Sequence, residues 1–149
     1  MGSGDVYKRQ GDIFSYKTTG GGVRIGQRKG STPDKSIIYV RFVKRNLILV
    51  DDLVSECLEH GKWNFIAATY EMKTGQATLY KNGEMLKRIN IGSNTIATRF
   101  PIRIGSIDGG VTSFSGLLSC LQIYNFTLSL ENVKQSQYAC RKGKLDIVF

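Results

Sequence analysis

The chain has 149 residues, of which 41% are hydrophobic, enough for one domain with a buried core. Its formal net charge is +9, and a basic surface attracts polyanions such as sulfated glycans, nucleic acid or anionic lipid without choosing among them. No repeat or low-complexity tract is visible, and no apolar run is long enough to cross a bilayer, so we expect no membrane insertion of this fragment.

The first ten residues do not resemble the rest of the domain. The run DVYKRQ at residues 5–10 resembles the in-frame translation of a transposase adapter used in sequencing libraries, and residues 1–4 would then be flanking scar. A natural polar N-terminus is the alternative. We interpret residues 1–10 as an adapter artefact and expect a domain that starts near Gly11 and is truncated at its N-terminus, so a missing signal peptide carries no information.

Short strands are predicted in succession from residue 12 to residue 50. Residues 12–17 and 23–28 form two strands joined at three glycines, and residues 30–34 form a loop. Residues 37–44 alternate, so that residues 38, 40 and 42 face one side and residues 39, 41 and 43 the other. A further strand is expected at residues 46–50, followed by a polar connection at residues 51–60.

The passage from residue 61 to residue 84 carries the strongest fold signal. Trp63, Phe65 and Ile66 belong to a strand that is apolar on both sides, and such a strand is covered on both sides. We therefore expect these three residues in the core between two sheets. The next strand turns at Asn82-Gly83 into another one, because a type I′ turn needs positive φ at both central residues.

The remaining chain adds strands at residues 100–104 and 114–124, separated by a glycine-rich loop. Ser129 is the expected N-cap of a short helix that runs toward Tyr138, and residues 141–149 form a basic, then apolar tail. About ten short strands and one short C-terminal helix predict an all-β fold, a two-sheet antiparallel β-sandwich or jelly roll, as a single domain over residues 11–140.

The three cysteines are an odd number. Cys120 lies in an apolar strand, and Cys140 follows the helix that would fold back beside it. A bridge between them would close a loop of about 20 residues, stabilise the fold by about 3 kcal/mol and indicate an oxidising compartment. Cys57 would then be a free thiol or pair with a cysteine outside this chain. Three reduced cytosolic cysteines are the alternative.

Four motifs resemble those of the laminin G-like, concanavalin A-like lectin jelly-roll superfamily. They are GKWNFIAA at residues 61–68, LYKNG at 79–83, IRIG at 102–105, and FSGLL with IYNFTLS at 114–118 and 123–129. Their order and spacing carry the resemblance, which covers residues 12–140, while the strands expected before residue 13 are absent. Cys120 and Cys140 resemble the C-terminal disulfide pair of many extracellular members.

The resemblance implies an extracellular or cell-surface module for recognition or adhesion that binds glycans, including sulfated ones, or proteins. Members often hold calcium at the sandwich rim, but Asp108 is the one candidate ligand placed here, far short of the six or more oxygens that calcium takes. A purely structural spacer domain of a matrix protein is the alternative. The superfamily also contains glucanases, which need two carboxylates aimed into one groove. No strand carries such a pair, so we expect no enzyme.

Basic side chains recur on strand faces opposite the apolar ones. If these strands are neighbours, the side chains form a stripe suited to an anionic glycan, because arginine pairs bidentately with sulfate and carboxylate. A solvated sheet face is the alternative reading. Nucleic acid is not an expected partner, because no basic motif is interleaved with aromatic residues. The candidate glycan contacts are Arg41, Lys44, Arg45, Lys87, Arg88, Arg99 and Arg103.

Two further positions have chemistry of their own. Asn125 begins an Asn-Phe-Thr sequon and would carry a glycan in a secreted protein, although it also serves to turn the chain out of the last strand. His60 and Cys57 offer two zinc-type ligands where a site needs three or four. No nucleophile is placed beside His60, so we expect neither zinc nor a catalytic histidine there.

Overall fold

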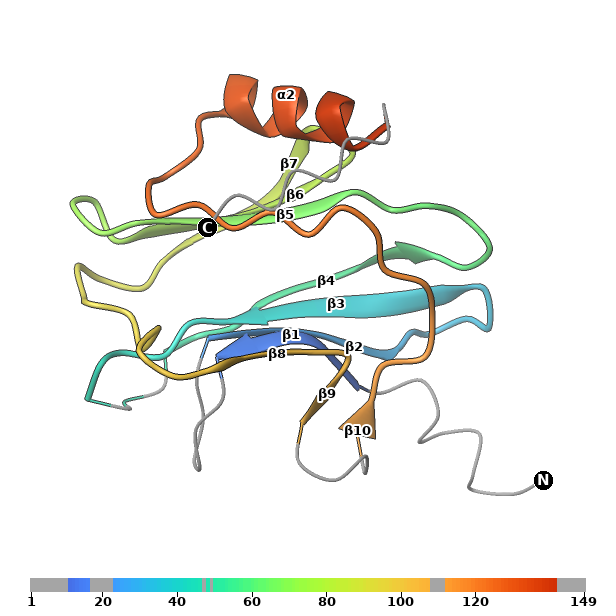
Figure 1. Cartoon of the computed structure of the whole chain (residues 1–149), viewed down its shortest axis with the longest axis horizontal. Helices are drawn as coiled ribbons and strands as arrows, with labels where there is room; N and C mark the ends of the chain where they lie inside the picture. Colours follow the sequence, from blue (N-terminus) through green and yellow to red (C-terminus); the bar gives the residue numbers. More distant parts are fainter. Residues whose placement is uncertain (1–10, 17–22, 47, 49, 108–111, 142–149) are drawn as a thin grey trace.

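The computed structural model describes residues 11–16, 23–46, 48, 50–107 and 112–141. Figure 1 shows two sheets facing each other, with a helix on the outer side of the smaller sheet. The fold is therefore the predicted β-sandwich. The elements are β1 (Gly11–Tyr16), β2 (Arg24–Lys29), β3 (Lys35–Arg41), β4 (Leu53–Glu59), β5 (Ile66–Glu71), β6 (Gln76–Lys81), β7 (Glu84–Asn90), β8 (Ile102–Ile104), β9 (Ser106–Ile107), β10 (Thr112–Ser113) and α2 (Leu130–Arg141).

The larger sheet has seven strands in the order β4-β3-β2-β1-β10-β9, with β8 also paired to β1. Its strand pairs are antiparallel except for one parallel contact between β1 and β10, at Asp12 and Ser113. The smaller sheet has the order β5-β6-β7 and is antiparallel throughout. This arrangement leaves one face of the larger sheet turned away from the rest of the molecule (Figure 1).

The core lies between β3 of the larger sheet and β6 of the smaller one. Ile38 and Val40 are 0% and 1% exposed, and they share one cluster with Ala77 and Leu79. The predicted alternation is thus confirmed within β3, although the strand ends at Arg41 and does not continue to residue 44. Its consequence for the site is that the intervening residues of β3, among them Tyr39 and Arg41, lie on the outer face of the larger sheet.

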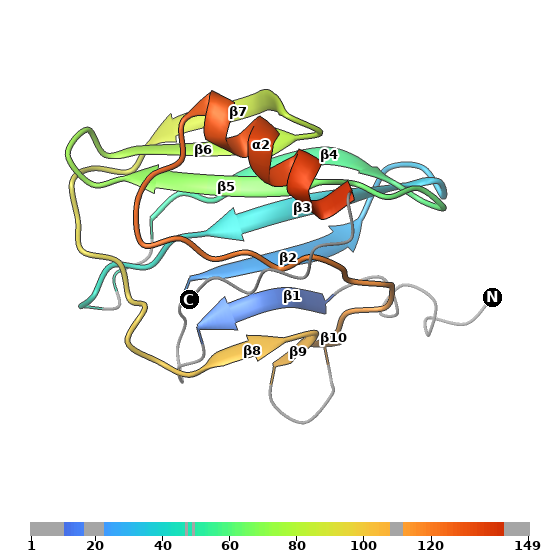
Figure 2. The same ribbon diagram turned by 45° about the horizontal axis from the view of Figure 1, so that its top comes forward.

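The predicted hairpin and helix are both present. Asn82 and Gly83 have φ of 51° and 81°, as the β6–β7 turn requires. Ser129 caps α2 by accepting a hydrogen bond from the Asn132 amide at 3.2 Å. The helix lies across the smaller sheet in Figure 2. Val133, a residue of α2, is fully buried. In the described part of the chain, no helix is both long and apolar enough to span a membrane.

The expected burial of Trp63 is wrong, because its side chain is 69% exposed. The strand begins at Ile66, three residues later than its sequence pattern suggests. Before it, the Asn64 side chain donates to the carbonyls of Glu59 at 2.9 Å and Lys62 at 3.0 Å, so the chain is still turning at residue 63. Ile66 packs against the core from a partly buried position, and Phe65 is half-buried.

The expected polar connection at residues 51–60 is instead the strand β4. Leu53 and Leu58 both point into the core although they are five residues apart. This is possible because the β3–β4 register shifts between Ser36 and Ile37, which breaks the alternation that a sequence pattern relies on. The described residues within 46–50, by contrast, form no strand.

The expected closing strand at residues 114–124 is also absent. β10 ends at Ser113, and Leu117 beyond it is 80% exposed. Two local features account for the irregular path. The Phe114 ring lies over Gly116, where a Cβ would be 2.6 Å from the ring, and Cys120 has φ of 58°, which is incompatible with an extended strand.

Candidate functional site

A row of arginines crosses the outer face of the larger sheet. Arg41 on β3 is directly opposite Arg24 on β2, and Arg24 is opposite Ser15 on β1. Ser15 is in turn opposite Arg103 on β8. Because residues directly opposite each other in a sheet point to the same side, these arginines share one face. Two of the predicted glycan contacts, Arg41 and Arg103, are therefore brought onto one surface.

Tyr39 forms the centre of this surface. Its ring lies over Gly26, where a Cβ would stand only 2.3 Å away, and its hydroxyl donates to Asp12 Oδ1 at 2.6 Å. The Arg28 guanidinium lies over the same ring, 4.4 Å from its centre. Burial of the phenol, together with its bond to the Asp12 carboxylate, raises the pKa of Tyr39 to about 12.

Asp52 forms a hydrogen-bonded ion pair with Arg41 and a longer ion pair with Arg28. Arg41 donates from Nε and Nη2 to the two Asp52 oxygens at 2.9 and 2.8 Å, a bidentate pair. This hydrogen-bonded carboxylate raises the pKa of the Arg41 guanidinium above its usual value. Arg28 Nη2 lies 3.9 Å from Asp52 Oδ2, too far for a hydrogen bond.

We call this surface the arginine face. Its arginines outnumber its carboxylates, so it carries a net positive charge. Some of its polar atoms are buried without a hydrogen-bond partner among the residues that the structure describes, namely Asp12 Oδ2, Ser15 Oγ and Arg24 Nε. The arginine face consists of Asp12, Ser15, Arg24, Arg28, Tyr39, Arg41, Asp52 and Arg103.

The other predicted glycan contacts lie away from the arginine face. Lys87 Nζ, on β7, donates to the Val54 carbonyl at 3.4 Å, and Arg88 Nε donates to Thr78 Oγ1 at 3.1 Å within the smaller sheet. The seven predicted residues therefore do not form one stripe.

Lys44, Arg45 and Arg99 belong to a third region, near the connection that follows β7. Lys44 forms an isolated bridge with Ile96, and the Arg45 amide donates to the Thr95 carbonyl at 2.7 Å. The Arg99 guanidinium lies 5.3 Å from the centre of the neighbouring Phe100 ring. Lys44 and Arg45 thus lie against residues 95–96 of that connection, and Arg99 lies three residues further along it.

Most members of the arginine face were missed by the sequence prediction. Arg24, Gly26 and Arg28 alternate within a strand that was predicted, so their shared side was available as a signal. Asp12 and Asp52 gave no such signal, because their role depends on which strands pair across the sheet.

The structure contains the disulfide between Cys120 and Cys140, which joins the segment before α2 to the end of that helix. Cys57 is a free, half-buried thiol. Burial raises the pKa of Cys57 above the usual value of a thiol. Whether it pairs with a cysteine outside this chain stays a prediction.

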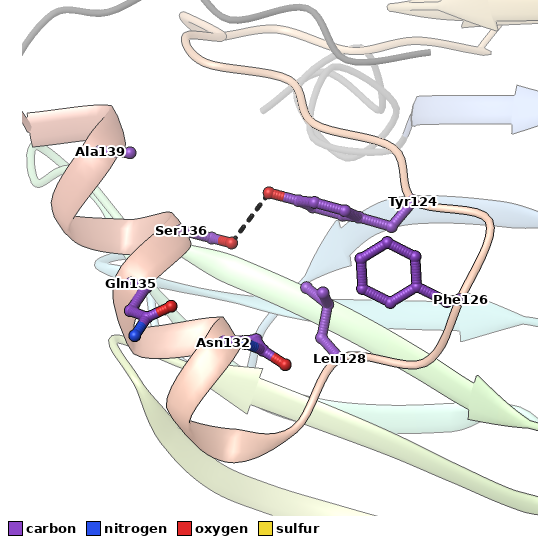
Figure 3. Close-up of a pocket in the computed structure, with 7 residues that line it drawn as sticks. All are labelled: Tyr124, Phe126, Leu128, Asn132, Gln135, Ser136 and Ala139. Atoms are coloured by element: carbon purple, nitrogen blue, oxygen red, sulfur yellow. Dashed lines mark hydrogen bonds between the residues drawn. The ribbon is translucent and has the colours of Figure 1, made fainter.

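A small pocket lies between α2 and the segment before it (Figure 3). Its volume is about 240 Å³, and one wall carries Tyr124 and Phe126, whose rings meet edge to face at 5.5 Å. The Tyr124 hydroxyl lies 3.0 Å from Ser136 Oγ on the helix. Asn125 is exposed beside this wall, so its glycosylation stays a prediction.

His60 lies beside a buried serine. His60 Nε2 lies 2.6 Å from Ser36 Oγ, and Gln27 Nε2 donates to the same oxygen at 2.9 Å. Ser36 is fully buried, so its hydroxyl cannot reach a substrate in this conformation. The described residues include no cluster of three or more His, Cys, Asp or Glu side chains that could hold a metal ion, and Asp108 lies outside the described residues.

The family model of the concanavalin A-like lectin/glucanases superfamily matches residues 5–134. In the part of the chain that the structure describes, two stacked sheets with one short helix define the class as a jelly-roll sandwich, and a match over most of the chain identifies its family. The chain belongs to the concanavalin A-like lectin/glucanases superfamily. The match begins inside the segment that we interpret as an adapter, and that interpretation stays a prediction.

Comparison with individual proteins adds little to this family assignment. No curated protein matches the chain significantly in sequence. Among solved structures, residues 221–444 of an S-layer domain-containing protein from Clostridium thermocellum match with 17% identity and a TM-score of 0.43. That match covers 86% of this chain, which spans 63% of the solved one.

Proposed function

We propose that the domain is a non-catalytic recognition module that binds acidic glycans on its arginine face. The observation that carries this proposal is the cross-strand row of Arg24, Arg41 and Arg103, with Arg28 beside it and only two aspartates among the members of the face. Arginine suits the carboxylate and sulfate groups of acidic sugars through bidentate hydrogen bonds. Membership of a superfamily of lectins and glucanases supports carbohydrate as the ligand class.

The hydrogen bonds that the carboxylates of the arginine face accept support a binding function over glycoside hydrolysis. A glycosidase places two carboxyl groups on either side of the scissile bond, one of them as an acid. On the arginine face, Asp12 Oδ1 accepts from Tyr39 and both oxygens of Asp52 accept from Arg41. The two aspartates of the face thus hold its own side chains in place.

The disulfide supports an extracellular or cell-surface location. Disulfides persist in oxidising compartments and are rare in the cytosol, where thiols are kept reduced. The bridge between Cys120 and Cys140 therefore supports a working environment outside the cytosol.

Heparin chromatography with a salt gradient tests the proposal, because displacement by salt reports the number of ionic contacts. We expect the double variant Arg28→Ala with Arg103→Ala to elute at lower salt than the parent. The matched control is Lys73→Ala with Lys134→Ala, which removes the same charge from exposed sites on the β5–β6 turn and α2.

Equal elution of the two double variants would remove the arginine face from the account. If the parent itself elutes no later than a generic protein of equal net charge, the domain is a spacer without a glycan ligand.

A further inference from the structure

Three buried polar atoms on the arginine face lack a hydrogen-bond partner, and they lie next to one another. Asp12 and Ser15 are each 3% exposed, and they are neighbours on the outer side of β1. Arg24 is directly opposite Ser15, and its Nε lies 3.7 Å from Asp12 Oδ2, beyond direct hydrogen-bond distance. Buried polar atoms almost always have a partner, so this cluster lacks a group that the described part of the chain does not supply.

The donor and acceptor chemistry of the cluster restricts what that group can be. A carboxylate oxygen only accepts hydrogen bonds, whereas the Nε–H of arginine only donates. A group between Asp12 Oδ2 and Arg24 Nε must therefore donate and accept at once. A hydroxyl does both. A sulfate or a carboxylate cannot donate, and Asp12 would repel either of them.

We propose that Asp12, Ser15 and Arg24 form a subsite for a sugar hydroxyl, and that the ligand of the arginine face is a uronate-type sugar. Such a sugar carries a free hydroxyl close to its carboxylate. The hydroxyl enters the subsite, and the carboxylate meets the arginines beside it. This inference rests on the proposed function and names its ligand class.

Arg28 is the group that moves to admit the sugar. Its side chain is 44% exposed, and among the described residues it is held by the ion pair at 3.9 Å and by its contact with the Tyr39 ring. Arg41 is fixed by two short hydrogen bonds and stays in place. Withdrawal of Arg28 uncovers the aromatic ring of Tyr39, a surface suited to the apolar face of a pyranose, and leaves Arg28 free to pair with the carboxylate.

Binding of two polyanionic probes distinguishes recognition of a sugar hydroxyl from attraction by charge alone. Alginate hexasaccharide carries carboxylates and free hydroxyls, whereas poly(vinyl sulfate) carries charge without any hydroxyl. Titration calorimetry with the full chain compares both probes with the variants Ser15→Ala and Asp12→Asn, and with Ser93→Ala as an exposed control.

We expect Ser15→Ala to weaken alginate binding about fivefold, the effect of one neutral hydrogen bond, and to leave poly(vinyl sulfate) binding unchanged. Asp12→Asn presents a donor in place of the acceptor, so it weakens alginate binding about tenfold or more. Because it also removes a negative charge, the same variant binds poly(vinyl sulfate) as tightly as the parent or more tightly. Ser93→Ala behaves as the parent with both probes.

Other results of these titrations would contradict either the hydroxyl subsite or the proposed function. If the parent binds both probes and neither subsite variant changes alginate binding, the arginine face remains an anion site and the hydroxyl subsite is wrong. A variant that unfolds more easily yet binds alginate normally means that a structural water fills the cluster, which also overturns the inference. A parent that binds neither probe removes the proposed function as well. If Asp12→Asn does not fold, Ser15→Ala decides alone.

Discussion

The ring of Tyr39 on β3 lies so close over Gly26 on β2 that a methyl group at residue 26 would stand 2.3 Å from it. This contact lets the tyrosine lie flat across the sheet and reach Asp12 on the strand beyond. The position of Tyr39 in the arginine face therefore depends on the absence of a side chain at Gly26, which lies on the strand between Tyr39 and its hydrogen-bond partner Asp12. Three strands are tied together by this one residue.

Gly26→Ala should displace the Tyr39 ring and break its hydrogen bond to Asp12. Overpacking and the lost bond together predict a fall of about 3 kcal/mol in the free energy of unfolding, measured by chemical denaturation. Gly61→Ala is the control, since Gly61 has φ of 71° with no atom near its Cβ position, and backbone strain alone predicts about 1 kcal/mol. Equal losses in the two variants would show that the ring does not need the space.

Tyr39 should also make the fold sensitive to alkaline pH. Its folded-state pKa of about 12 lies above the ordinary value of 10. The stabilisation from the protonated phenol is therefore fully present below pH 10 and is lost as the pH rises toward 12, because the unfolded chain ionises first. The free energy of unfolding, measured between pH 9 and 12, should fall less steeply for Tyr39→Phe than for the parent. Parallel slopes would mean that Tyr39 ionises as freely in the fold as outside it.

Removal of the disulfide should destabilise the domain without changing the arginine face. The bridge joins residues 20 apart in the sequence, and a loop of that size contributes about 3 kcal/mol in the chain-entropy model. Cys120→Ser with Cys140→Ser should lower the free energy of unfolding by about that amount under oxidising conditions. The parent in reductant should match the double variant, and a parent that is indifferent to reductant would contradict the assignment.

Trp63, the single tryptophan, gives a direct optical test of the strand boundary at Ile66. Because its ring is 69% exposed, its fluorescence in the folded protein should already peak at the long wavelengths typical of indole in water. Acrylamide should quench it nearly as well before unfolding as after. A blue-shifted emission that is protected from acrylamide would instead place Trp63 in the core, where the sequence pattern alone puts it.

The contrast between Trp63 and Ile38 explains what the sequence could predict. Alternation within one strand is a local property, so the inward side of β3 and the outward positions of Tyr39 and Arg41 follow from the chain itself. The start of β5 depends on a turn that Asn64 stabilises through its side chain, and a run of apolar residues does not reveal such a turn. The strand β4 was likewise not predicted, because the β3–β4 register shift interrupts its alternation and the sequence does not reveal that shift.

The arginine face shows the same limit at the level of the site. Arg41 and Arg103 could be proposed as neighbours from their phases, and strand pairing through Ser15 and Arg24 places them in one row. Lys44, Arg45, Lys87, Arg88 and Arg99 have similar charge but are held elsewhere, because strand order is set by long-range packing. Charge and phase identify candidates, and the sheet topology selects among them.

A titration of the isotopically labelled protein with heparin hexasaccharide, followed amide by amide by NMR, tests the central claim most directly. The account predicts that the largest shifts fall on the arginine face, at Arg24, Tyr39 and Arg41, and at Gly26 beneath the Tyr39 ring, with α2 unaffected. Shifts confined to α2, or to the turn that carries Lys44 and Arg45, would contradict it.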